Sequence, residues 1–383
     1  MKKVFCFISS LLLLSACKEV YKPALHSPAT GYLVVEGFIN SGEGETAITL
    51  SRTVKAEDVA TINYEHNAVV SVEGENNESY QLIEGLNGVY ASSGSLNLNN
   101  AEKYRLHIRT SAGQEYVSDF TAVKYTPPID SITWQRDNGG VRIYVSTHDA
   151  TNNTRYYQWK YTETWEFHSR YIKTLDYQFD PVTNDVTGVG NSSPSPDTTI
   201  YKCWQTRNSS DIIIGTSEKL STDKIYLPIN YIQPDAEELT VLYHIKLQQY
   251  ALSHQAYLFY QQIKKNTEQL GTIFDPQPTE LNTNIHCISD PSESVIGYVE
   301  VSQEQSKELF IYNSEVSPWV TGVGCSLIVI TNKADSIKPY VYGYTAVQPV
   351  TFRGLAIATF SIAPLSCVDC TLRGSNIRPS YWP

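Results

Sequence analysis

Alternating hydrophobic and polar residues in the first third of the chain predict a series of short β-strands. In each segment every second side chain is apolar, which is the pattern of a sheet that buries one face. Asn87-Gly88 and Ala112-Gly113, which lie between such segments, supply residues that tolerate a positive φ angle and indicate turns. The spacing predicts an immunoglobulin- or fibronectin-like β-sandwich over residues 31–125. Its expected strands are 32–39, 47–50, 68–72, 80–83, 104–108 and 115–120.

A proline-containing connector, residues 125–129, interrupts this pattern and predicts a boundary before a second β-rich domain, residues 130–383. The second domain carries aromatic residues at odd positions, so an extended strand places them all on one face. Two interpretations remain open, a sandwich core with aromatic pairs across strands and a platform for a sugar or peptide ligand. The aromatic residues are Tyr157, Trp159, Tyr161, Trp165 and Phe167.

Residues 180–199 show no periodicity and predict a loop of about twenty residues, with Gly188-Val-Gly190 inside it. After Glu163 the alternation loses its polar face, which predicts an exposed aromatic patch beside this loop. We expect this patch to be the contact surface for a ligand or partner. The alternative is that a C-terminal strand or the helix after Ser253 covers the rings. The candidate contact residues are Trp165, Phe167, Tyr171 and Tyr177.

One helix is expected, at about residues 253–270, after an alternating strand at 239–250. Ser253 is a favourable N-cap and Gly271 a favourable C-terminal stop. Apolar residues recur at helical spacing and predict a face that packs on the sheet, with partner binding as the other interpretation. That face consists of Ala256, Phe259, Tyr260 and Ile263.

The N-terminus has the form of a lipoprotein signal peptide. Two lysines precede an apolar run at residues 4–14 that is too short to cross a bilayer, which takes about 20 residues. Leu14-Ser15-Ala16-Cys17 then matches a bacterial lipobox, in which cleavage before the cysteine accompanies lipid attachment to its thiol. The alternative is an ordinary secretory signal with a chance cysteine. We expect a signal peptide at 1–16, lipidation of Cys17 and a tether at 17–30.

The charge of the chain excludes some partners. Removing residues 1–16 takes away Lys2 and Lys3 and shifts the formal net charge from −11 to −13. Nucleic acid and anionic lipid headgroups are therefore poor partners. Lys18-Glu19 lacks the aspartate that retains many lipoproteins in the inner membrane, so we expect an outer-membrane lipoprotein, at the cell surface or on the periplasmic face.

Five cysteines after Cys17 form an odd set, which leaves at least one thiol free and allows fifteen ways to make two bridges. Cys367 and Cys370 have the spacing of a redox pair or of half a zinc site. The surrounding sequence lacks a thioredoxin-like context and a second ligand pair, so we expect no metal or cofactor. We favour a disulfide staple for the C-terminal segment, with Cys325 as a possible partner of the pair. The five candidates are Cys203, Cys287, Cys325, Cys367 and Cys370.

The sequence contains none of the common catalytic motifs. His148-Asp149 is the nearest approach to a base and its orienting acid, but adjacent residues of a strand or turn point apart. Asp149 is better explained as the start of a turn at Asn152-Asn153. A site assembled from distant residues would leave no such motif, so an enzyme stays an open alternative.

Four groups of segments carry a resemblance to a known family: 33–37 with 50–53; 156–159 with 163–167; 249–253, 265–268, 274–278, 284–285 and 295–298; and 367–374 with Trp382. They resemble a family of Bacteroidota lipoproteins catalogued as domain of unknown function 4249, and the resemblance runs almost from end to end. Cys287 stands where that family often has another residue. The resemblance implies a surface or periplasmic lipoprotein, commonly encoded beside a TonB-dependent outer-membrane receptor, and it supplies no catalytic residues.

These observations predict a non-enzymatic accessory lipoprotein that binds a TonB-dependent receptor in nutrient uptake. Two other functions remain open. One is an envelope enzyme that processes glycans or peptides with an unrecognised site, and the other is a structural or adhesion module.

Overall fold

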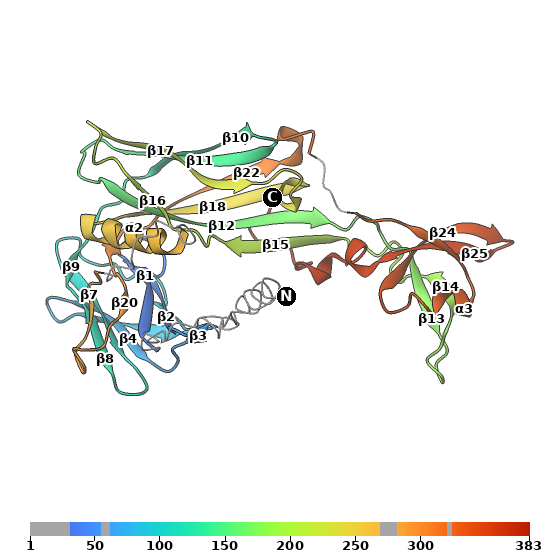
Figure 1. Cartoon of the computed structure of the whole chain (residues 1–383), viewed down its shortest axis with the longest axis horizontal. Coiled ribbons are helices and arrows are strands. Elements are labelled where there is room, and N and C mark those ends of the chain that lie inside the picture. The colour runs from blue at the N-terminus through green and yellow to red at the C-terminus, as the bar shows by residue number, and fades with distance from the viewer. Residues whose placement is uncertain (1–30, 55–61, 269–281, 320–323) are drawn as a thin grey trace, which may run out of the picture.

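The computed structural model describes residues 31–54, 62–268, 282–319 and 324–383. The lipobox and the predicted helix stop at Gly271 lie outside these residues. The chain is mainly β, as predicted, and Figure 1 shows three units. Two sandwiches lie side by side at one end, and a smaller unit lies at the other end. Within the described residues no helix is long and apolar enough to cross a membrane.

The first sandwich contains all six strands predicted from alternation, together with three shorter ones. Its strands are hydrogen-bonded into one continuous sheet, and inward side chains of that sheet form one core that includes Leu33, Leu50 and Val72. Asn87 and Gly88 both have a positive φ, as their predicted turn requires. The strands are β1 (Leu33–Asn40), β2 (Ala47–Arg52), β3 (Asn63–Tyr64), β4 (Val69–Gly74), β5 (Ser79–Glu84), β6 (Val89–Ala91), β7 (Lys103–Arg109), β8 (Glu115–Ser118) and β9 (Thr121–Ala122).

Three short strands from much later in the chain complete this first sandwich. β19 (Ile285–Cys287) pairs antiparallel with β8, while β20 (Ile296–Gly297) and β21 (Val301–Ser302) pair parallel with β1. The predicted domain 130–383 is therefore not self-contained, because residues 285–302 return to the first sheet. Strands of two or three residues are too short to show a period, so the local sequence does not reveal which sheet they join.

The second sandwich packs two antiparallel sheets face to face. The odd-position aromatics of its central strand all point into the core between the sheets, which confirms the core interpretation of that pattern. One sheet has the order β10-β11-β17, and the other β15-β12-β18-β22 with β16 also on β12. The strands are β10 (Ile129–Asp137), β11 (Gly140–Asp149), β12 (Tyr156–His168), β15 (Lys202–Asn208), β16 (Ile213–Thr216), β17 (Asp223–Ile232), β18 (Leu242–Ala251) and β22 (Gln305–Tyr312).

The third unit contains a hairpin where the sequence predicted a loop. β13 (Leu175–Phe179) pairs with β14 (Val186–Asn191), so the prediction of a loop over all of residues 180–199 is wrong for residues 186–191. Gly188 and Gly190 lie in β14, where a Cβ would come 3.0 Å from Asn332 Oδ1 and 2.4 Å from Gln178 Nε2, respectively. Close packing thus explains glycines that resemble a loop in the sequence.

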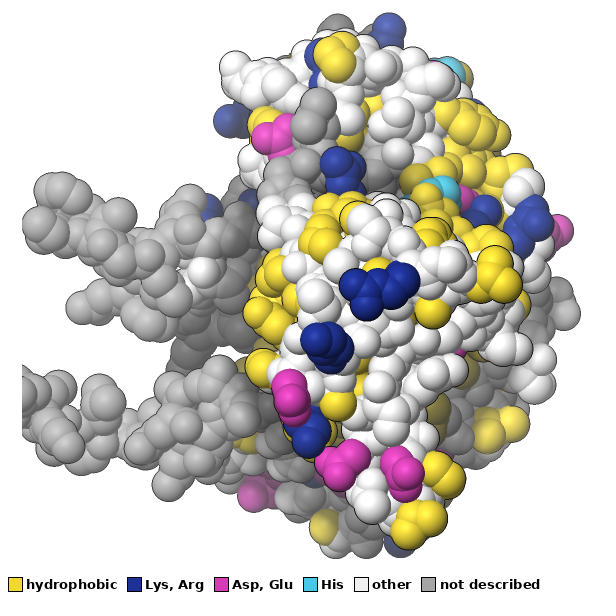
Figure 2. All heavy atoms as spheres, turned by 90° about the vertical axis from the view of Figure 1, so that its right-hand side faces the viewer, with side chains coloured by type: hydrophobic (Ala, Val, Ile, Leu, Met, Phe, Trp, Pro, Cys, Tyr) yellow, Lys and Arg dark blue, Asp and Glu magenta, His cyan; other side chains and the backbone are white. Residues whose placement is uncertain are grey.

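A three-stranded sheet completes the third unit and shares a core with the hairpin. That sheet has the order β23-β25-β24, and the core includes Val186, Val189 and Phe360. Figure 2, which faces this side of the molecule, shows many hydrophobic side chains at the surface. The remaining elements are β23 (Ile328–Thr331), α3 (Ala334–Ile337), β24 (Tyr344–Arg353) and β25 (Ala356–Pro364), with short 3₁₀ turns at Glu237–Leu239, Asn313–Glu315, Leu365–Cys367 and Cys370–Leu372.

Helix α2 (His254–Glu268) lies beside both sandwiches in Figure 1. Ser253 caps it as predicted, because its Oγ accepts the backbone N–H of Ala256 at 3.1 Å. Ala256 is buried in one cluster with Phe38 of the first sandwich and Tyr250 of the second, and Tyr260 packs against that cluster. Phe259 is also buried. The predicted apolar stripe therefore packs at the junction of the two sandwiches.

A buried carboxylate at the start of α2 makes stability depend on pH. The Ser253 hydroxyl donates to Glu300 Oε1, and Glu300 is 0% exposed. Burial raises the pKa of Glu300 above its ordinary value of 4.5, and the Ser253 hydrogen bonds and Lys124 only partly oppose this. Above pH 4.5 the unfolded chain loses this proton while the native chain keeps it, so the contribution of Glu300 to stability falls as the pH rises through that window.

We therefore expect Glu300→Gln to remove part of the decline in unfolding free energy as the pH rises above 4.5. The amide can still accept from Ser253, but it does not ionise. Urea unfolding at a series of pH values measures this, with Glu45→Gln at an exposed position as the control. Parallel pH profiles for wild type and Glu300→Gln would contradict the assignment.

Candidate functional site

The predicted aromatic contact patch does not exist as an exposed surface. Trp165 is 3% exposed and Phe167 is 0% exposed, and both belong to the core of the second sandwich. The Arg207 guanidinium lies 5.3 Å from the Trp165 ring centroid, and that of Arg373 lies 4.8 Å from the Phe167 ring. Arg373 of the C-terminal segment therefore covers part of the Phe167 ring, and Arg207 of β15 covers part of the Trp165 ring. The alternative interpretation expected cover from a C-terminal strand or the helix after Ser253; the cover on Phe167 does come from the C-terminal segment, but from residues beside a 3₁₀ turn.

Tyr171 and Tyr177 are also partly enclosed, at separate places. The Tyr171 hydroxyl donates to the Cys325 carbonyl at 3.0 Å, and the Tyr177 ring packs edge-on to Phe360 at 6.4 Å between centroids. The structure thus divides the four predicted residues among different packing clusters. They do not form one binding surface.

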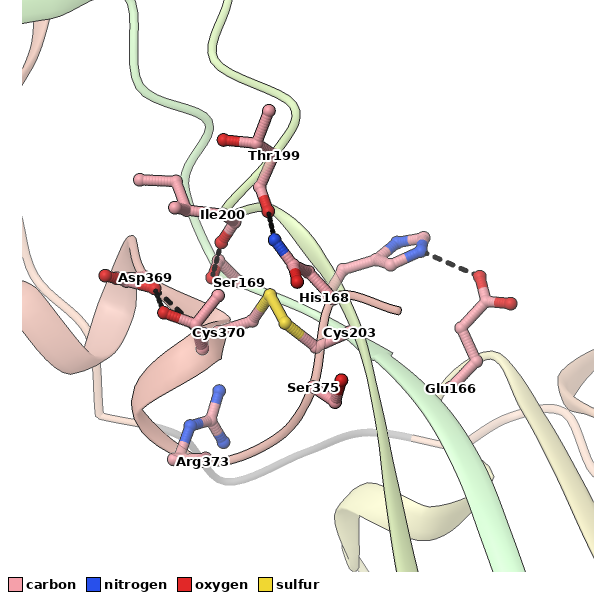
Figure 3. The surroundings of a disulfide bond; sticks show 12 residues. Glu166, His168, Ser169, Thr199, Ile200, Cys203, Asp369, Cys370, Arg373 and Ser375 are labelled. Atoms are coloured by element: carbon pink, nitrogen blue, oxygen red, sulfur yellow. Dashed lines mark hydrogen bonds and ion pairs between the residues drawn. A yellow bond between two sulfur atoms is a disulfide. The ribbon is translucent and has the colours of Figure 1, made fainter. Parts of the chain in front are cut away.

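Two disulfides fasten the C-terminal segment. Cys203 bonds to Cys370 and Cys325 to Cys367, which confirms a bridge between the Cys367/Cys370 pair and Cys325. The two cysteines of the pair have different partners, and Cys287 is buried with a free thiol. Around Cys203–Cys370 in Figure 3, Ser169 Oγ donates to the Ile200 carbonyl at 3.2 Å. This surrounding network ties β15 to the chain end and is structural.

His148 and Asp149 do not act together. His148 Nδ1 lies 2.8 Å from Asp130 Oδ2, whereas Asp149 accepts the backbone N–H groups of three turn residues, Thr151, Asn153 and Thr154. Burial alone would raise the pKa of Asp149, but these bonds and the Thr151 hydroxyl outweigh it and lower the pKa to about 2. Asp149 therefore organises the turn, as predicted. The described residues also contain no cluster of three potential metal-ligating side chains.

A cleft lies where the two sandwiches meet α2, and we call it the junction cleft. Its volume is about 790 Å³, within the range of about 300–1,000 Å³ that is usual for small-molecule sites. β1 and β20 form one wall, the outer face of β12 and β18 another, and α2 with residues 208–212 a third. The lining residues are Val34, Val35, Glu36, Gly37, Ile62, Gln158, Lys160, Tyr161, Thr162, Asn208, Ser209, Ser210, Asp211, Ile212, Gln248, Phe259, Tyr260, Ile263, Ile296, Gly297 and Tyr298.

Lys160 places an ammonium group in the junction cleft without a direct partner. No hydrogen bond or ion pair joins its Nζ to any described residue, and the nearest recorded contact is the Phe38 ring, whose centroid is 5.7 Å away. Burial lowers the pKa of Lys160, and the charges of Glu36 and Glu304 only partly restore it. A half-buried cation that lacks a hydrogen-bond acceptor favours a ligand that supplies one.

Gln158 presents a second unsatisfied group, two residues before Lys160 on the same face of β12. It is 4% exposed, and its Oε1 has no hydrogen-bond partner among the described residues. Gln249, another buried glutamine, is different, because its Oε1 accepts from Trp159 and its Nε2 donates to the Pro127 carbonyl. Buried amides are normally satisfied in this way, so the orphan oxygen of Gln158 marks the cleft as a place for a ligand.

The walls of the junction cleft are held in place by specific contacts. Lys264 Nζ donates to the Ile212 carbonyl at 2.8 Å, and Ser209 Oγ accepts the Tyr161 N–H at 3.0 Å. Gly297 has φ +152°, and a Cβ there would lie 2.4 Å from the Val35 carbonyl oxygen. Only glycine fits this close approach of β20 to β1. The cleft therefore has a built framework on three sides.

Sequence reasoning missed the junction cleft because its residues come from segments more than two hundred positions apart. The available signal was the polar face of β12, where Gln158 and Lys160 alternate with the buried aromatics. The lining contains the hydroxyls of Ser209 and Ser210, but no histidine or cysteine among its described residues. The amide, ammonium and hydroxyl groups of this lining can form hydrogen bonds with a ligand.

Comparison with known proteins gives one family. A model described as "Domain of unknown function (DUF4249)" matches residues 18–308, and no curated protein matches the chain. A structure of manganese lipoxygenase of Gaeumannomyces graminis with part of zonadhesin of Komagataella pastoris aligns at 9% identity and TM-score 0.18, covering 59% of this chain and 90% of that one. A chitinase from Bacillus thuringiensis aligns at 12% identity and TM-score 0.16, covering 53% and 29%. Likenesses this weak carry no functional argument.

Proposed function

The chain belongs to the DUF4249 family, and from that premise we propose that it is a lipid-anchored, non-enzymatic binding protein of the outer membrane that serves a TonB-dependent receptor in nutrient uptake. The junction cleft is its ligand site. The observation that carries this proposal is the pair of unsatisfied groups, Gln158 Oε1 and the Lys160 ammonium, in a cleft with built walls.

The anchor rests on the lipobox around Cys17, and three acyl chains would hold the protein to a membrane firmly. Cys17→Ala is expected to move the protein from the membrane fraction to the soluble fraction at high salt. Cys6→Ala, in the apolar run of the signal peptide, is the matched control and should stay membrane-bound. Sedimentation and immunoblotting measure the result, and a Cys17→Ala variant that remains with membranes would overturn the anchor.

The receptor partnership is tested on the lipidated chain in outer membranes. Cross-linking followed by affinity isolation is expected to recover a TonB-dependent receptor identified by mass spectrometry. Recovery of peptidoglycan or of surface components of other cells, in place of a receptor, would favour a structural or adhesion module. Turnover of polysaccharide or peptide libraries by the purified protein would favour the envelope enzyme.

A further inference from the structure

We infer that the junction cleft recognises a short apolar peptide, whose backbone accepts from Lys160 and donates to Gln158. This inference rests on the proposed function only in treating the cleft as a ligand site. It adds the chemical class of the ligand, and three observations on the cleft walls support it.

The first observation is that aliphatic side chains from every wall line the cleft. Sugars present hydroxyl groups on most of their surface, and burying them against branched aliphatic groups leaves those hydroxyls without partners. Apolar peptide side chains lose no hydrogen bonds there and gain from leaving water. The aliphatic lining residues are Val34, Val35, Ile62, Ile212, Ile263 and Ile296.

The second observation is that the cleft aromatics pack on one another. Phe259 contacts Tyr260 at 5.4 Å and Tyr298 at 5.6 Å between ring centroids, and Tyr260 stacks on Phe38 at 6.4 Å. Stacking on a sugar needs an open ring face. These rings instead form a continuous wall, which suits an apolar side chain better than a pyranose ring.

The third observation is the arrangement of polar groups. Gln158 and Lys160 are two residues apart in β12, so their side chains start about 7 Å apart on one face. An extended peptide repeats its backbone N–H and C=O groups at the same spacing. One N–H can therefore donate to Gln158 Oε1 while a C=O accepts from Lys160 Nζ.

The charges of the lining disfavour a polyanion. Among the described residues that line the cleft, Lys160 carries a positive charge, whereas Glu36 and Asp211 carry negative charges. An acidic glycan or a nucleotide would meet more negative than positive charge. A short peptide with free ends is a zwitterion, and its ammonium end matches the carboxylates.

The test uses the full lipidated chain in lipid nanodiscs, titrated calorimetrically with leucyl-alanyl-leucine and, separately, with maltotetraose. We expect the tripeptide to bind and the sugar not to bind. Lys160→Met and Gln158→Met should each weaken tripeptide binding about ten-fold or more, because each removes one buried hydrogen bond while keeping the side-chain volume. Lys246→Met is the matched control, since Lys246 is exposed on the same sheet but outside the cleft lining, and it should bind as wild type.

Unchanged affinity in both cleft variants, binding of maltotetraose in place of the tripeptide, or absence of tripeptide binding by wild type would each overturn this inference. Melting temperatures of the variants identify any loss of fold. If Lys160→Met unfolds, Gln158→Met and a Lys160→Gln variant provide the same comparison. The anchor and receptor experiments do not involve the cleft, so the proposed function can stand when the peptide inference fails.

Discussion

Replacing both Cys203 and Cys370 by serine is expected to lower the free energy of unfolding by at least about 2–4 kcal/mol, the usual value of a native disulfide. The chain-entropy model gives about 5 kcal/mol for a separation of 167 residues and about 4 for the 42 residues between Cys325 and Cys367. Both Cys203 and Cys370 are 0% exposed in the core of the second sandwich. The serine hydroxyls would therefore also be buried in an apolar environment, which lowers the free energy of unfolding further.

Replacing both Cys325 and Cys367 by serine should lower the free energy of unfolding by less, because this bridge closes a shorter loop and Cys325 is only half-buried. Urea unfolding of both double variants under non-reducing conditions shows directly which one loses more unfolding free energy. Cys287→Ser leaves both bridges intact and controls for the replacement of a buried thiol. Equal stability of wild type and the Cys203/Cys370 variant would show that the bridge does not hold the C-terminal segment in place.

Elements with strong local patterns were predictable from the sequence. Alternation located the main strands of the first sandwich, and the odd-position aromatics from Tyr157 to Phe167 located the core of the second. Ser253 located the start of α2, because an N-cap acts through its own neighbouring N–H groups. In each case the physical cause lies within a few residues of the signal.

Features that depend on distant partners were not predictable. β20 and β21 are strands because β1 offers them an edge, and β14 is a strand because β13 and Asn332 surround its glycines. The sequence also indicated a disulfide between Cys325 and one cysteine of the Cys367/Cys370 pair. It did not indicate that Cys203 bonds to the other cysteine, Cys370. Spatial proximity decides such pairings, and sequence spacing alone does not.

The junction cleft shows the same limit for function. Aromatic residues suggested a surface after Glu163, yet burial in the core is the commoner fate of such residues in a sheet. The polar residues between them, Gln158 and Lys160, became informative only when the structure showed that they lack partners. An unsatisfied buried group is a property of three-dimensional surroundings, so no one-dimensional pattern reports it.

Deleting residues 181–197 and joining the ends with a short Gly-Ser bridge is expected to unfold the third unit. The deletion removes β14 and with it Val186 and Val189, two buried members of the core shared with Phe360. Burial of two valines contributes about 3–6 kcal/mol. It also removes the bond from the Val189 N–H to Asn332 Oδ1, 3.1 Å long, and leaves β13 without its strand partner.

The expected result is fast amide hydrogen exchange and protease cleavage in β24 and β25, while the second sandwich keeps its own core and stays protected. Hydrogen exchange with mass spectrometry separates these regions. Val182→Ala is the control, because Val182 is 90% exposed in the turn of the hairpin and its loss should change neither region. If the deletion left β25 protected, the hairpin would be a dispensable surface loop, and residues 180–199 would again be a reasonable place to look for a partner contact. Loss of protection would instead show that the hairpin is part of the fold, which is the result that its buried valines require.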